Sequence, residues 1–451
     1  MLIPEKLLAG LRELTDDPYF CIAYSGGMDS HVLLHAMIEC QKQNSSIQIR
    51  ALHVNHHLNP NANQWEDHCK KIAQHLGISF HAESLRLTLN PGDSIEAVAR
   101  RARYNVLQNH IHEEENVLTA HTQNDQAETF LLQLLRGSGV KGLSAMPLKK
   151  KIGKGYLLRP FLKMNREELK KYAEKNHLHW IEDDMNFELR FNRNYLRHAV
   201  LPILRRRWPK IFSVISRSAS HCAEASYLLD QSADANLQAM KTKEALAIKP
   251  LLQLTPEQQR NILRRWMYRL GFSVPQTKQL EQIRSDVLKA SEDAAPLFIY
   301  GSTEIRRYDN ALHISAASSE HDAHMIIPWN LNHLLNLPGT LGVLQATKKK
   351  GEGISTAIDI RKITVQFRRG GERCRPAGRQ ETYSLKKLMQ KWKIPPWQRD
   401  RTPLIYYDDR LITVVGYCIC GGFTAKNDEC GWVIKHIIPT AKNNMYCTQA
   451  G

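Results

Sequence analysis

The stretch Ser25-Gly26-Gly27-Met28-Asp29-Ser30 decides the fold of the first part of this chain. It follows an apolar run at residues 20–24 and precedes a second one at residues 31–37, so a buried strand, a glycine turn and a helix are expected in that order. Glycine lets a backbone approach an anion closely, and the first N–H groups of a helix point toward it. The stretch therefore predicts a phosphate-binding loop, to which Ser25 and Ser30 add hydroxyl groups.

We predict that this loop binds the phosphates of a nucleotide through Ser25, Gly26, Gly27, Met28, Asp29 and Ser30. Asp29 can also hold a hard cation such as Mg²⁺ against those phosphates. No Lys follows the glycines, so the loop differs from the G-x-x-x-x-G-K-S/T motif. The plainer alternative is a glycine turn capped by serine and aspartate, but the six-residue string between a strand and a helix favours the phosphate loop.

Composition indicates a basic protein of more than one domain. The chain has 451 residues, enough for two or three domains, and 62 Lys and Arg against 45 Asp and Glu give a net charge of +17. This surplus suggests a polyanionic partner such as nucleic acid, although an evenly spread charge would serve only solubility. Neither a signal sequence nor an apolar run of about 18 residues occurs. We therefore expect a cytoplasmic protein that does not enter a membrane.

Nine cysteines without regular spacing are typical of reduced thiols. Cys418 and Cys420, with Cys430 and His436 beyond them, could be interpreted as a metal site. A C-x-C gap is unlike the usual spacing of zinc ligands, so we expect no zinc there.

Strand and helix patterns alternate over the first part of the chain. Four further strands are predicted at residues 47–56, 78–82, 116–121 and 156–161, and helical periodicity separates them. This alternation predicts an α/β fold, a doubly wound parallel sheet with helices on both faces. Ligands bind outside the carboxyl ends of such strands. The phosphate loop, His53 and the segment 121–128 all fall there, so we expect His53 to line the nucleotide site.

The segment from His121 to Glu128 carries the second chemical signal. Asp125 and Glu128 are three residues apart at a helix start, so both carboxylates lie on one side of it. One could bind Mg²⁺ and the other an amine. The alternative is a capping box, with Asp125 as cap and Glu128 as its reciprocal partner. Spacing alone favours the cap, and the position beside the phosphate loop favours the functional interpretation.

Several further motifs carry a resemblance to a known family. The phosphate loop resembles that of the ATP pyrophosphatases, the PP-loop superfamily, and the whole set of motifs resembles the tRNA(Ile)-lysidine synthetases over nearly the full length. The discriminating strings stand near the C-terminus. The matching motifs are His53-Val54-Asn55-His56-His57-Leu58, Glu96-Ala97 with Arg100, Arg103 and Tyr104, His121 to Thr129, Arg159-Pro160, Arg193-Asn194 with Arg197, Arg264-Arg265-Trp266, Arg306-Arg307-Tyr308, Gly370-Gly371-Glu372 and Ile394-Pro395-Pro396-Trp397. The chain departs from the family pattern at two positions. Thr122 stands where the family often has a second histidine, and Asn124 stands where it often has aspartate. The second change removes one possible metal ligand, so we favour Asp125 over Asn124 as a site residue.

The resemblance implies a two-step ligation. ATP and Mg²⁺ adenylate the wobble cytidine of a CAU anticodon in tRNA(Ile), and free L-lysine then displaces AMP to give lysidine. Asp125 and Glu128 become candidates to orient the lysine, with Glu128 or His121 taking its proton. Arg100 and Arg103, one turn apart, would contact RNA phosphate or the activated base, the alternative being a solvated basic face.

The sequence suggests three domains: a catalytic domain at residues 1–209, a mainly helical domain at 210–345 and an α+β domain at 346–451. The latter two are expected to hold tRNA, and Lys348-Lys349-Lys350-Gly351 is expected to be an exposed connector between them. Another PP-loop enzyme, such as a tRNA thiolase, remains an alternative, although such thiolases usually carry a C-x-x-C pair that this chain lacks. An RNA-binding protein with a relic nucleotide site is the non-enzyme alternative, and homodimer formation is left open.

Overall fold

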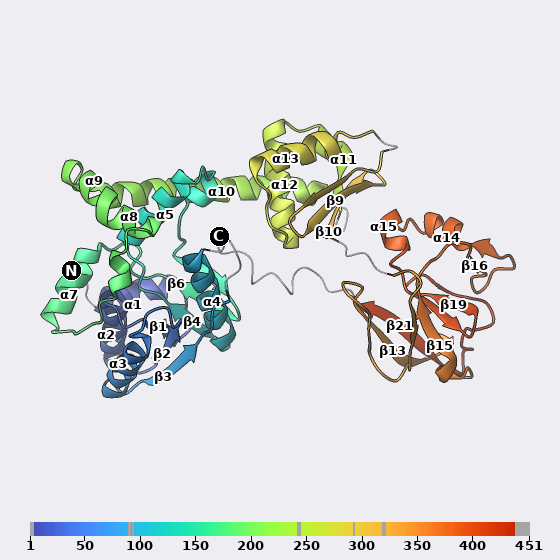
Figure 1. Cartoon of the computed structure of the whole chain (residues 1–451), viewed down its shortest axis with the longest axis horizontal. Helices are drawn as coiled ribbons and strands as arrows, with labels where there is room; N and C mark the ends of the chain where they lie inside the picture. The colour runs from blue at the N-terminus through green and yellow to red at the C-terminus, as the bar shows by residue number, and fades with distance from the viewer. Residues whose placement is uncertain are drawn as a thin grey trace. The chain divides into compact units, whose positions relative to one another are not determined.

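The computed structural model describes residues 4–88, 92, 94–240, 245–291, 294–317 and 322–437. The chain divides into two compact units, with the division between Ser232 and Ala233. Figure 1 shows the long helix α10 (Ile211–Ala239), which contains this division. Among the residues described, no helix is both long and apolar enough to cross a membrane.

The first unit is built on a six-stranded sheet in the order β3-β2-β1-β4-β6-β5. Five strands are parallel, and β5 pairs with β6 antiparallel. The strands are β1 (Tyr19–Ala23), β2 (Gln48–Asn55), β3 (Ser79–Ser84), β4 (Glu115–Leu118), β5 (Lys149–Ile152) and β6 (Gly155–Leu158). The helices before α10 are α1 (Pro4–Arg12), α2 (Met28–Gln43), α3 (Ala62–His75), α4 (Ile95–His110), α5 (Gln123–Leu135), α6 (Val140–Leu143), α7 (Arg166–Lys175), η1 (Asp184–Phe187), α8 (Asn192–Tyr195), η2 (Leu196–Val200) and α9 (Leu201–Arg207).

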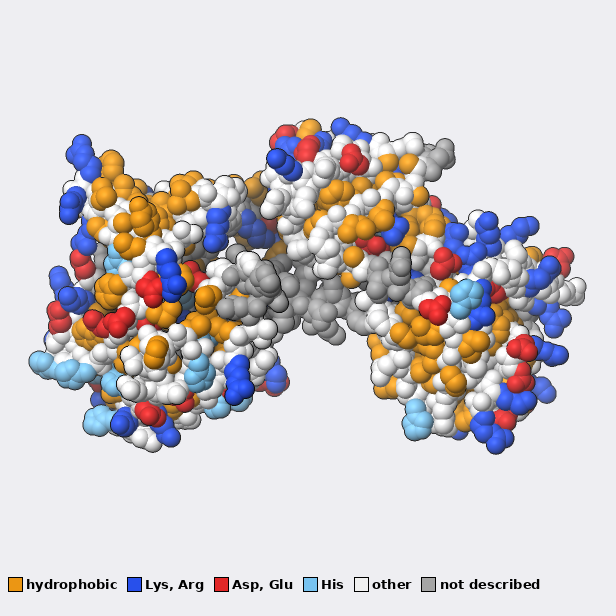
Figure 2. All heavy atoms as spheres, viewed as in Figure 1, with side chains coloured by type: hydrophobic (Ala, Val, Ile, Leu, Met, Phe, Trp, Pro, Cys, Tyr) orange, Lys and Arg blue, Asp and Glu red, His pale blue; other side chains and the backbone are white. Residues whose placement is uncertain are grey.

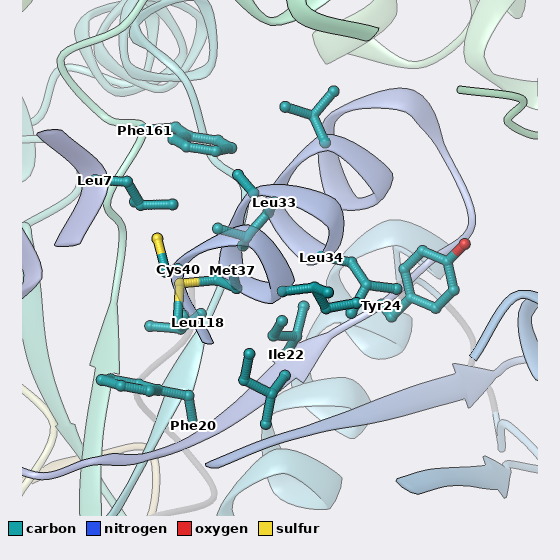
Figure 3. Packing of buried hydrophobic residues seen from close by; sticks show 14 of the residues in the cluster. Leu7, Phe20, Ile22, Tyr24, Leu33, Leu34, Met37, Cys40, Leu118 and Phe161 are labelled. Atoms are coloured by element: carbon teal, nitrogen blue, oxygen red, sulfur yellow. The ribbon is translucent and has the colours of Figure 1, made fainter. Parts of the chain in front are cut away.

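Both faces of the central strand β1 are buried, which is why its residues 20–23 are continuously apolar. Phe20 and Ile22 of β1 face the helix α2, whose Leu33 and Met37 are fully buried against them, as Figure 3 shows. Cys21, between them in β1, points to the opposite face, where it packs in a second cluster with residues of α4. The predicted doubly wound sheet is confirmed.

The strand order places a crevice at the carboxyl end of β1. The chain proceeds from β1 to β2 and β3 on one side, and β4 lies on the other side of β1. This reversal is the topological switch point at which open α/β sheets bind their ligands. The phosphate loop follows β1 and the segment beginning at His121 follows β4, so the two predicted motifs meet at this crevice.

The strand β5 was missed in the sequence, and β6 is shorter than the predicted strand 156–161. β5 begins with Lys149-Lys150-Lys151, a run without the usual strand pattern. It is an edge strand, and lysines on an edge discourage pairing with another chain. β6 ends before Arg159, whose guanidinium donates to the carbonyl of Pro147 at 2.7 Å.

The second unit begins with a helical layer and a sheet. In the region predicted to be mainly helical, Thr255 caps the start of α12, and Ile262 and Trp266 of this helix are buried. The sequence missed the antiparallel sheet β7-β10-β9-β8 beside these helices. The elements are β7 (Leu246–Ala247), α11 (Ile248–Leu252), α12 (Pro256–Leu270), α13 (Thr277–Gln282), η3 (Ile283–Leu288), β8 (Leu297–Tyr300), β9 (Thr303–Tyr308) and β10 (Ala311–Ala316).

The remainder of the second unit consists of antiparallel sheets with short helices. The sheet orders are β11-β15-β18-β19-β20, β12-β13-β21-β14 and β16-β17. The elements are β11 (Ile326–Pro328), β12 (Leu335–Asn336), β13 (Val343–Lys350), β14 (Ile354–Ser355), η4 (Ile360–Lys362), β15 (Ile363–Gln366), β16 (Arg373–Cys374), β17 (Tyr383–Ser384), α14 (Leu385–Lys391), α15 (Pro396–Arg399), β18 (Leu404–Tyr407), β19 (Arg410–Val414), β20 (Cys418–Ile419) and β21 (Cys430–Ile437).

The prediction that residues 348–351 connect two domains is wrong. Its three lysines are the end of β13, where Lys348 pairs with Trp432 of β21 and its Nζ lies 4.8 Å from the centre of that indole ring. The predicted division between residues 345 and 346 therefore falls inside a strand. Three consecutive lysines carry no local strand signal. They form a strand because the distant segment β21 pairs with them.

We predict that Gly155→Ala destabilises the first unit, because a Cβ at this position would lie 1.9 Å from the backbone oxygen of Glu115. Backbone cannot move aside as a side chain can, so the cost should reach about 1–3 kcal/mol, as for overpacking in a core. The measurement is the free energy of unfolding in urea.

Gly10→Ala is the matched control. Gly10 lies in α1, where an added Cβ meets no atom within 4 Å among the described residues. Alanine should stabilise this helix by roughly 0.5–1 kcal/mol. Equal effects of the two substitutions would show that the contact at Gly155 does not limit stability.

Candidate active site

A cavity of about 700 Å³ lies in the first unit at the carboxyl ends of β1, β2 and β4. Residues of the phosphate loop, α4 and the start of α7 line it, together with the segment that contains η1, α8 and η2. The sheet therefore supplies the floor of the site and later parts of the unit supply its walls.

The phosphate loop is held in shape by its own serines. The Ser30 hydroxyl lies 3.0 Å from that of Ser25 and donates to the carbonyl of Gly27 at 2.9 Å. Gly26 has a φ of +81°, and an added Cβ would lie 2.8 Å from Cys69 Sγ. Gly27 is the N-cap of α2 and has no side chain to occupy the N–H groups of the first turn. Those N–H groups can therefore receive an anion.

Asp29 lies in the first turn of α2 and faces an arginine that the sequence analysis did not single out. Arg166, the first residue of α7, donates its Nε to Asp29 Oδ2 at 3.1 Å. Burial raises the pKa of Asp29, and Arg166 opposes that shift. The Asn124 side chain, through Oδ1, accepts the backbone N–H of Arg166 at 3.1 Å and so fixes the start of α7 beside the loop.

Asp125 and Glu128 form an ion cluster with two arginines. Arg193 donates to Asp125 Oδ1 at 3.0 Å and to Glu128 Oε2 at 2.8 Å. Arg197, one turn further along, donates to the same Asp125 oxygen at 3.1 Å and to Glu128 Oε1 at 2.7 Å. Two positive and two negative charges thus balance, with Glu128 only 1% exposed.

The predicted capping box of Asp125 and Glu128 is wrong. The N-cap of α5 is Thr122, and Asp125 is the third residue of the helix and closes the box by accepting the Thr122 N–H at 2.8 Å. Burial alone would raise the pKa of Asp125, but Arg193, His121 and Arg197 lower it well below its usual value. Asp125 therefore stays ionised. The Glu128 carboxylate accepts hydrogen bonds from Arg193 and Arg197 and takes no part in capping the helix.

Two histidines of the site are hydrogen-bonded and neutral at physiological pH. His121 Nδ1 lies 2.9 Å from the Thr119 hydroxyl, and burial lowers the pKa of His121 to about 3. His53 is buried, with its Nδ1 2.9 Å from the Tyr24 carbonyl oxygen. Because a carbonyl only accepts, Nδ1 carries the proton and Nε2 is left as an acceptor. Burial also lowers the pKa of His53.

Arg100 and Arg103 both line the cavity, from α4. Arg103 donates its Nε to His56 Nε2 at 3.3 Å, so the proton of the neutral His56 ring lies on Nδ1. Burial lowers the pKa of His56 to about 4. Among the described residues, this buried Nδ1 has no hydrogen-bond partner. A donor is therefore left unsatisfied beside the cavity.

Comparison with known proteins covers most of the chain. The PP-loop domain family matches residues 4–204, the TilS substrate binding domain matches 246–313, and the TilS substrate C-terminal domain matches 363–436. The tRNA(Ile)-lysidine synthase of Coxiella burnetii is 64% identical over 433 residues, 96% of each chain. The chain belongs to the tRNA(Ile)-lysidine synthase family. The synthase of Methylococcus capsulatus is 40% identical over 399 residues, 88% of this chain and 90% of that one. The match to a solved structure of a TILS C-terminal domain covers 26% of this chain and 98% of that domain, at 22% identity and with a TM-score of 0.22.

Membership in the tRNA(Ile)-lysidine synthase family makes this chain an enzyme with a PP-loop ATP-binding domain, as the sequence predicts. It sets aside the thiolase and the non-catalytic alternatives. The roles of individual residues in this synthase remain predictions.

The structure brings all the predicted site residues of this synthase to one cavity except Gly26 and Glu128, which lie behind its wall. Sequence reasoning assigned no role to Arg166, Arg193 or Arg197. Arg193 and Arg197 stand four residues apart, a spacing that places both on one face of a helix. That spacing was a usable signal, but their partners lie more than sixty residues earlier in the chain.

We predict that Glu128→Gln destabilises this synthase by about 3 kcal/mol, because two half-buried guanidinium groups would then share one carboxylate. Its lysidine-forming rate should fall at least ~10-fold, equivalent to about 1.4 kcal/mol, since the arginines also shape the cavity. Urea unfolding and steady-state kinetics provide the two readouts.

Glu167→Gln serves as the control for this substitution. Glu167 pairs with Arg205 on the surface, with a side chain 56% exposed, so both quantities should stay near the wild-type values. If the Glu128 variant behaves like this control, the ion cluster has no part in either stability or turnover.

Proposed function

We propose that this enzyme ligates lysine onto the wobble cytidine of the CAU anticodon of tRNA(Ile), through an adenylated cytidine and with release of pyrophosphate and AMP. The single observation that carries the proposal is the meeting of the phosphate loop and the ion cluster at one cavity, in a chain 64% identical to a named synthase. Lysidine pairs with A instead of G, so the product would change the codon specificity from methionine to isoleucine.

The first step requires the leaving pyrophosphate to be stabilised. The N–H groups at the start of α2 and the hydroxyls of Ser25 and Ser30 are suited to its oxygens. Arg166 is close enough to add a positive charge, since it already contacts Asp29 in the loop. The cytidine 2-carbonyl oxygen then attacks the α-phosphate while these groups hold the departing charge.

Asp29 is the residue we assign to Mg²⁺. Among the described residues, Asp29 belongs to no group of three metal-ligating side chains whose ligand atoms lie within 4.8 Å of one another, and Asp125 is the acid that acts on it electrostatically. One carboxylate fits Mg²⁺, which usually takes one or two protein oxygens together with substrate phosphates and water. Bound there, the ion would neutralise phosphate charge, and Arg166 would turn from Asp29 toward the phosphates.

The second step requires a neutral lysine amine held near the activated carbon. We assign the orienting role to Asp125, whose side chain is 14% exposed and lines the cavity. Glu128 faces Arg193 and Arg197 and is nearly inaccessible, which supports a positioning role for it. His121, with its pKa near 3, is a weak proton acceptor, so it would orient ligands by hydrogen bonding rather than take the proton.

Arg100, Arg103 and His56 are the groups we assign to the RNA side of the cavity. The two arginines supply positive charge for phosphate, which positions RNA without reading sequence. The unpartnered Nδ1–H of His56 is a directional donor that a base or ribose oxygen would satisfy. Arg103 fixes the tautomer that presents this proton.

The second unit supplies further basic surface for tRNA. Figure 2 shows Lys and Arg side chains gathered over α14, α15 and β16. The exposed members in this region are Arg373, Arg375, Arg379, Lys386, Lys387 and Lys391.

Homodimer formation is a further proposal, supported by exposed apolar side chains in the first unit. Leu135 at the end of α5, Ile203 of α9 and Tyr227 of α10 are 74%, 67% and 63% exposed. Figure 2 shows hydrophobic side chains gathered over these helices. Sedimentation velocity of the wild type and of Ile203→Glu would detect a dimer that this surface holds together.

The proposed reaction is tested by incubating the enzyme with ATP, radiolabelled lysine and total tRNA. Label should enter one tRNA species, and each label incorporated should be matched by one AMP and one pyrophosphate. Label spread over many tRNA species, or tRNA binding without label, would contradict the proposal.

We predict that Asp29→Ala abolishes lysine incorporation while tRNA affinity stays within about two-fold, because a single carboxylate carries the Mg²⁺ site. The rate is measured at saturating ATP, and tRNA affinity is measured separately. Glu39→Ala, in the last part of the same helix α2, is the control and should keep full activity. Normal turnover of the Asp29 variant would overturn the assignment.

We predict that replacing Lys386, Lys387 and Lys391 by Gln lowers the slope of log affinity for tRNA against log salt by up to about 0.9 per lost phosphate contact. The three residues stand on α14, whereas a truncation at Ile363 would also remove β21 and leave β13 without its partner strand. ATP binding should be unchanged.

The same triple replacement at Lys42, Lys70 and Lys71, exposed in the first unit, is the control. An equal slope for wild type and the α14 variant would show that this charge is only a solvated surface.

A further inference from the structure

Three cysteines of the second unit lie in contact. Cys374 Sγ, in β16, is 2.9 Å from Cys420 Sγ and 3.7 Å from Cys418 Sγ. Cys374 and Cys420 are buried, 2% and 6% exposed, whereas Cys418 is half-buried. Cys418 is therefore the least buried of the three thiols, although it also packs against the neighbouring apolar side chains.

Backbone pairing brings the three thiols together. The Ala377 N–H donates to the Ile419 carbonyl at 2.9 Å, and the Gly421 N–H donates to the Arg375 carbonyl at 2.7 Å. This pairing lays the segment after Cys374 along the segment 418–421. Side chains two residues apart on an extended chain point to the same face, so Cys418 and Cys420 both meet Cys374. Leu388, Trp392 and Leu411 pack around the cluster.

A metal ion does not account for this arrangement. Among the described residues, the group whose ligand atoms all lie within 4.8 Å of one another is His81, Glu83 and His110, and the cysteines are not such a group. His436, considered above as a ligand, lies with Nε2 2.6 Å from the Leu341 carbonyl oxygen, so that nitrogen donates and cannot bind metal. The thiols form a row, with Cys374 in the middle, which suits exchange between neighbours.

We propose that Cys418, Cys374 and Cys420 form a thiol–disulfide exchange site for small disulfides of the oxidised glutathione type. The Cys418 thiolate attacks one sulfur of the small disulfide, which forms a mixed disulfide and releases one small thiol. The Cys374 thiolate then attacks Cys418 Sγ, which forms the Cys374–Cys418 disulfide and releases the second small thiol. Two protein thiols are oxidised, the small disulfide is reduced to two thiols, and the two protein protons go to them.

The final exchange moves the disulfide inward. The Cys420 thiolate attacks Cys374 Sγ, which forms the Cys374–Cys420 disulfide and returns Cys418 as a thiol. Cys418 is the entry point because it is the least buried thiol of the three, and its thiolate can accept a hydrogen bond from Cys374 at 3.7 Å. That bond is the main cause that lowers the pKa of Cys418 to about 4. The proposal does not rest on the function proposed above.

The test treats the full-length enzyme with oxidised glutathione and follows its intact mass, its free thiols and its mapped disulfides. The wild type should lose two free thiols and gain one internal disulfide between Cys374 and Cys420. Cys418→Ser should slow this reaction at least ~10-fold, because a buried thiol is a poor entry point. Cys374→Ser should stop at a mixed disulfide on Cys418, with no internal disulfide.

Cys430→Ser is the matched control, since Cys430 is exposed in the same unit and no described cysteine lies in contact with it. It should react like the wild type. Circular dichroism checks that each variant is folded, and Cys374→Ala repeats the central test if the serine is not tolerated. An internal disulfide that forms at the wild-type rate in the Cys418 variant, or a wild type that takes up glutathione without closing a disulfide in this cluster, would overturn the proposal.

Discussion

The candidate active site depends on one electrostatic constraint, the neutralisation of two inward-facing carboxylates by two arginines. Removing a carboxylate from water costs several kcal/mol, so Asp125 and Glu128 can share one turn of α5 only with positive partners. Arg193 and Arg197 reach both of them, which fixes the segment containing α8 and η2 against the carboxyl end of the sheet. Charge thus adds to the apolar packing that joins this part of the chain to α5, where Leu201 and Ala127 share a buried cluster. This explains how a short helical segment far along the chain keeps its place in the site.

The same balance recurs at the phosphate loop, where Asp29 faces Arg166. Asp29, Asp125 and Glu128 each have an arginine partner, so these carboxylates are held in fixed positions before a ligand binds. Arg100 and Arg103 add positive charge on the α4 side. An anionic ligand enters a cavity whose charges are already arranged, and preorganised charges of this kind need little rearrangement as a reaction proceeds. The switch point of the sheet supplies the place of the cavity, and these pairs supply its fixed charges.

How far the sequence predicts this structure depends on the range of the interactions. The strand, glycine turn and helix around residues 25–30 follow from local patterns and are confirmed. The capping box was assigned to the wrong pair because Thr122, Asp125 and Glu128 all stand at compatible spacings, and only the distant arginines decide between them. The lysine run of β13 carries no strand pattern, and its partner β21 begins eighty residues later in the chain. Long-range pairs of this kind leave no local signal.

The residues assigned to the reaction lie in the first unit, and the basic side chains around α14 that are assigned to tRNA binding lie in the second unit. All the groups that line the cavity precede residue 200, while the thiol cluster and the basic side chains around α14 belong to the second unit. Arg373 and Arg375 flank Cys374 directly, so a disulfide to Cys420 would restrain the backbone that carries them. Thiol chemistry at this place would then act on the surface assigned to tRNA and leave the nucleotide site untouched, because no residue is shared between the two.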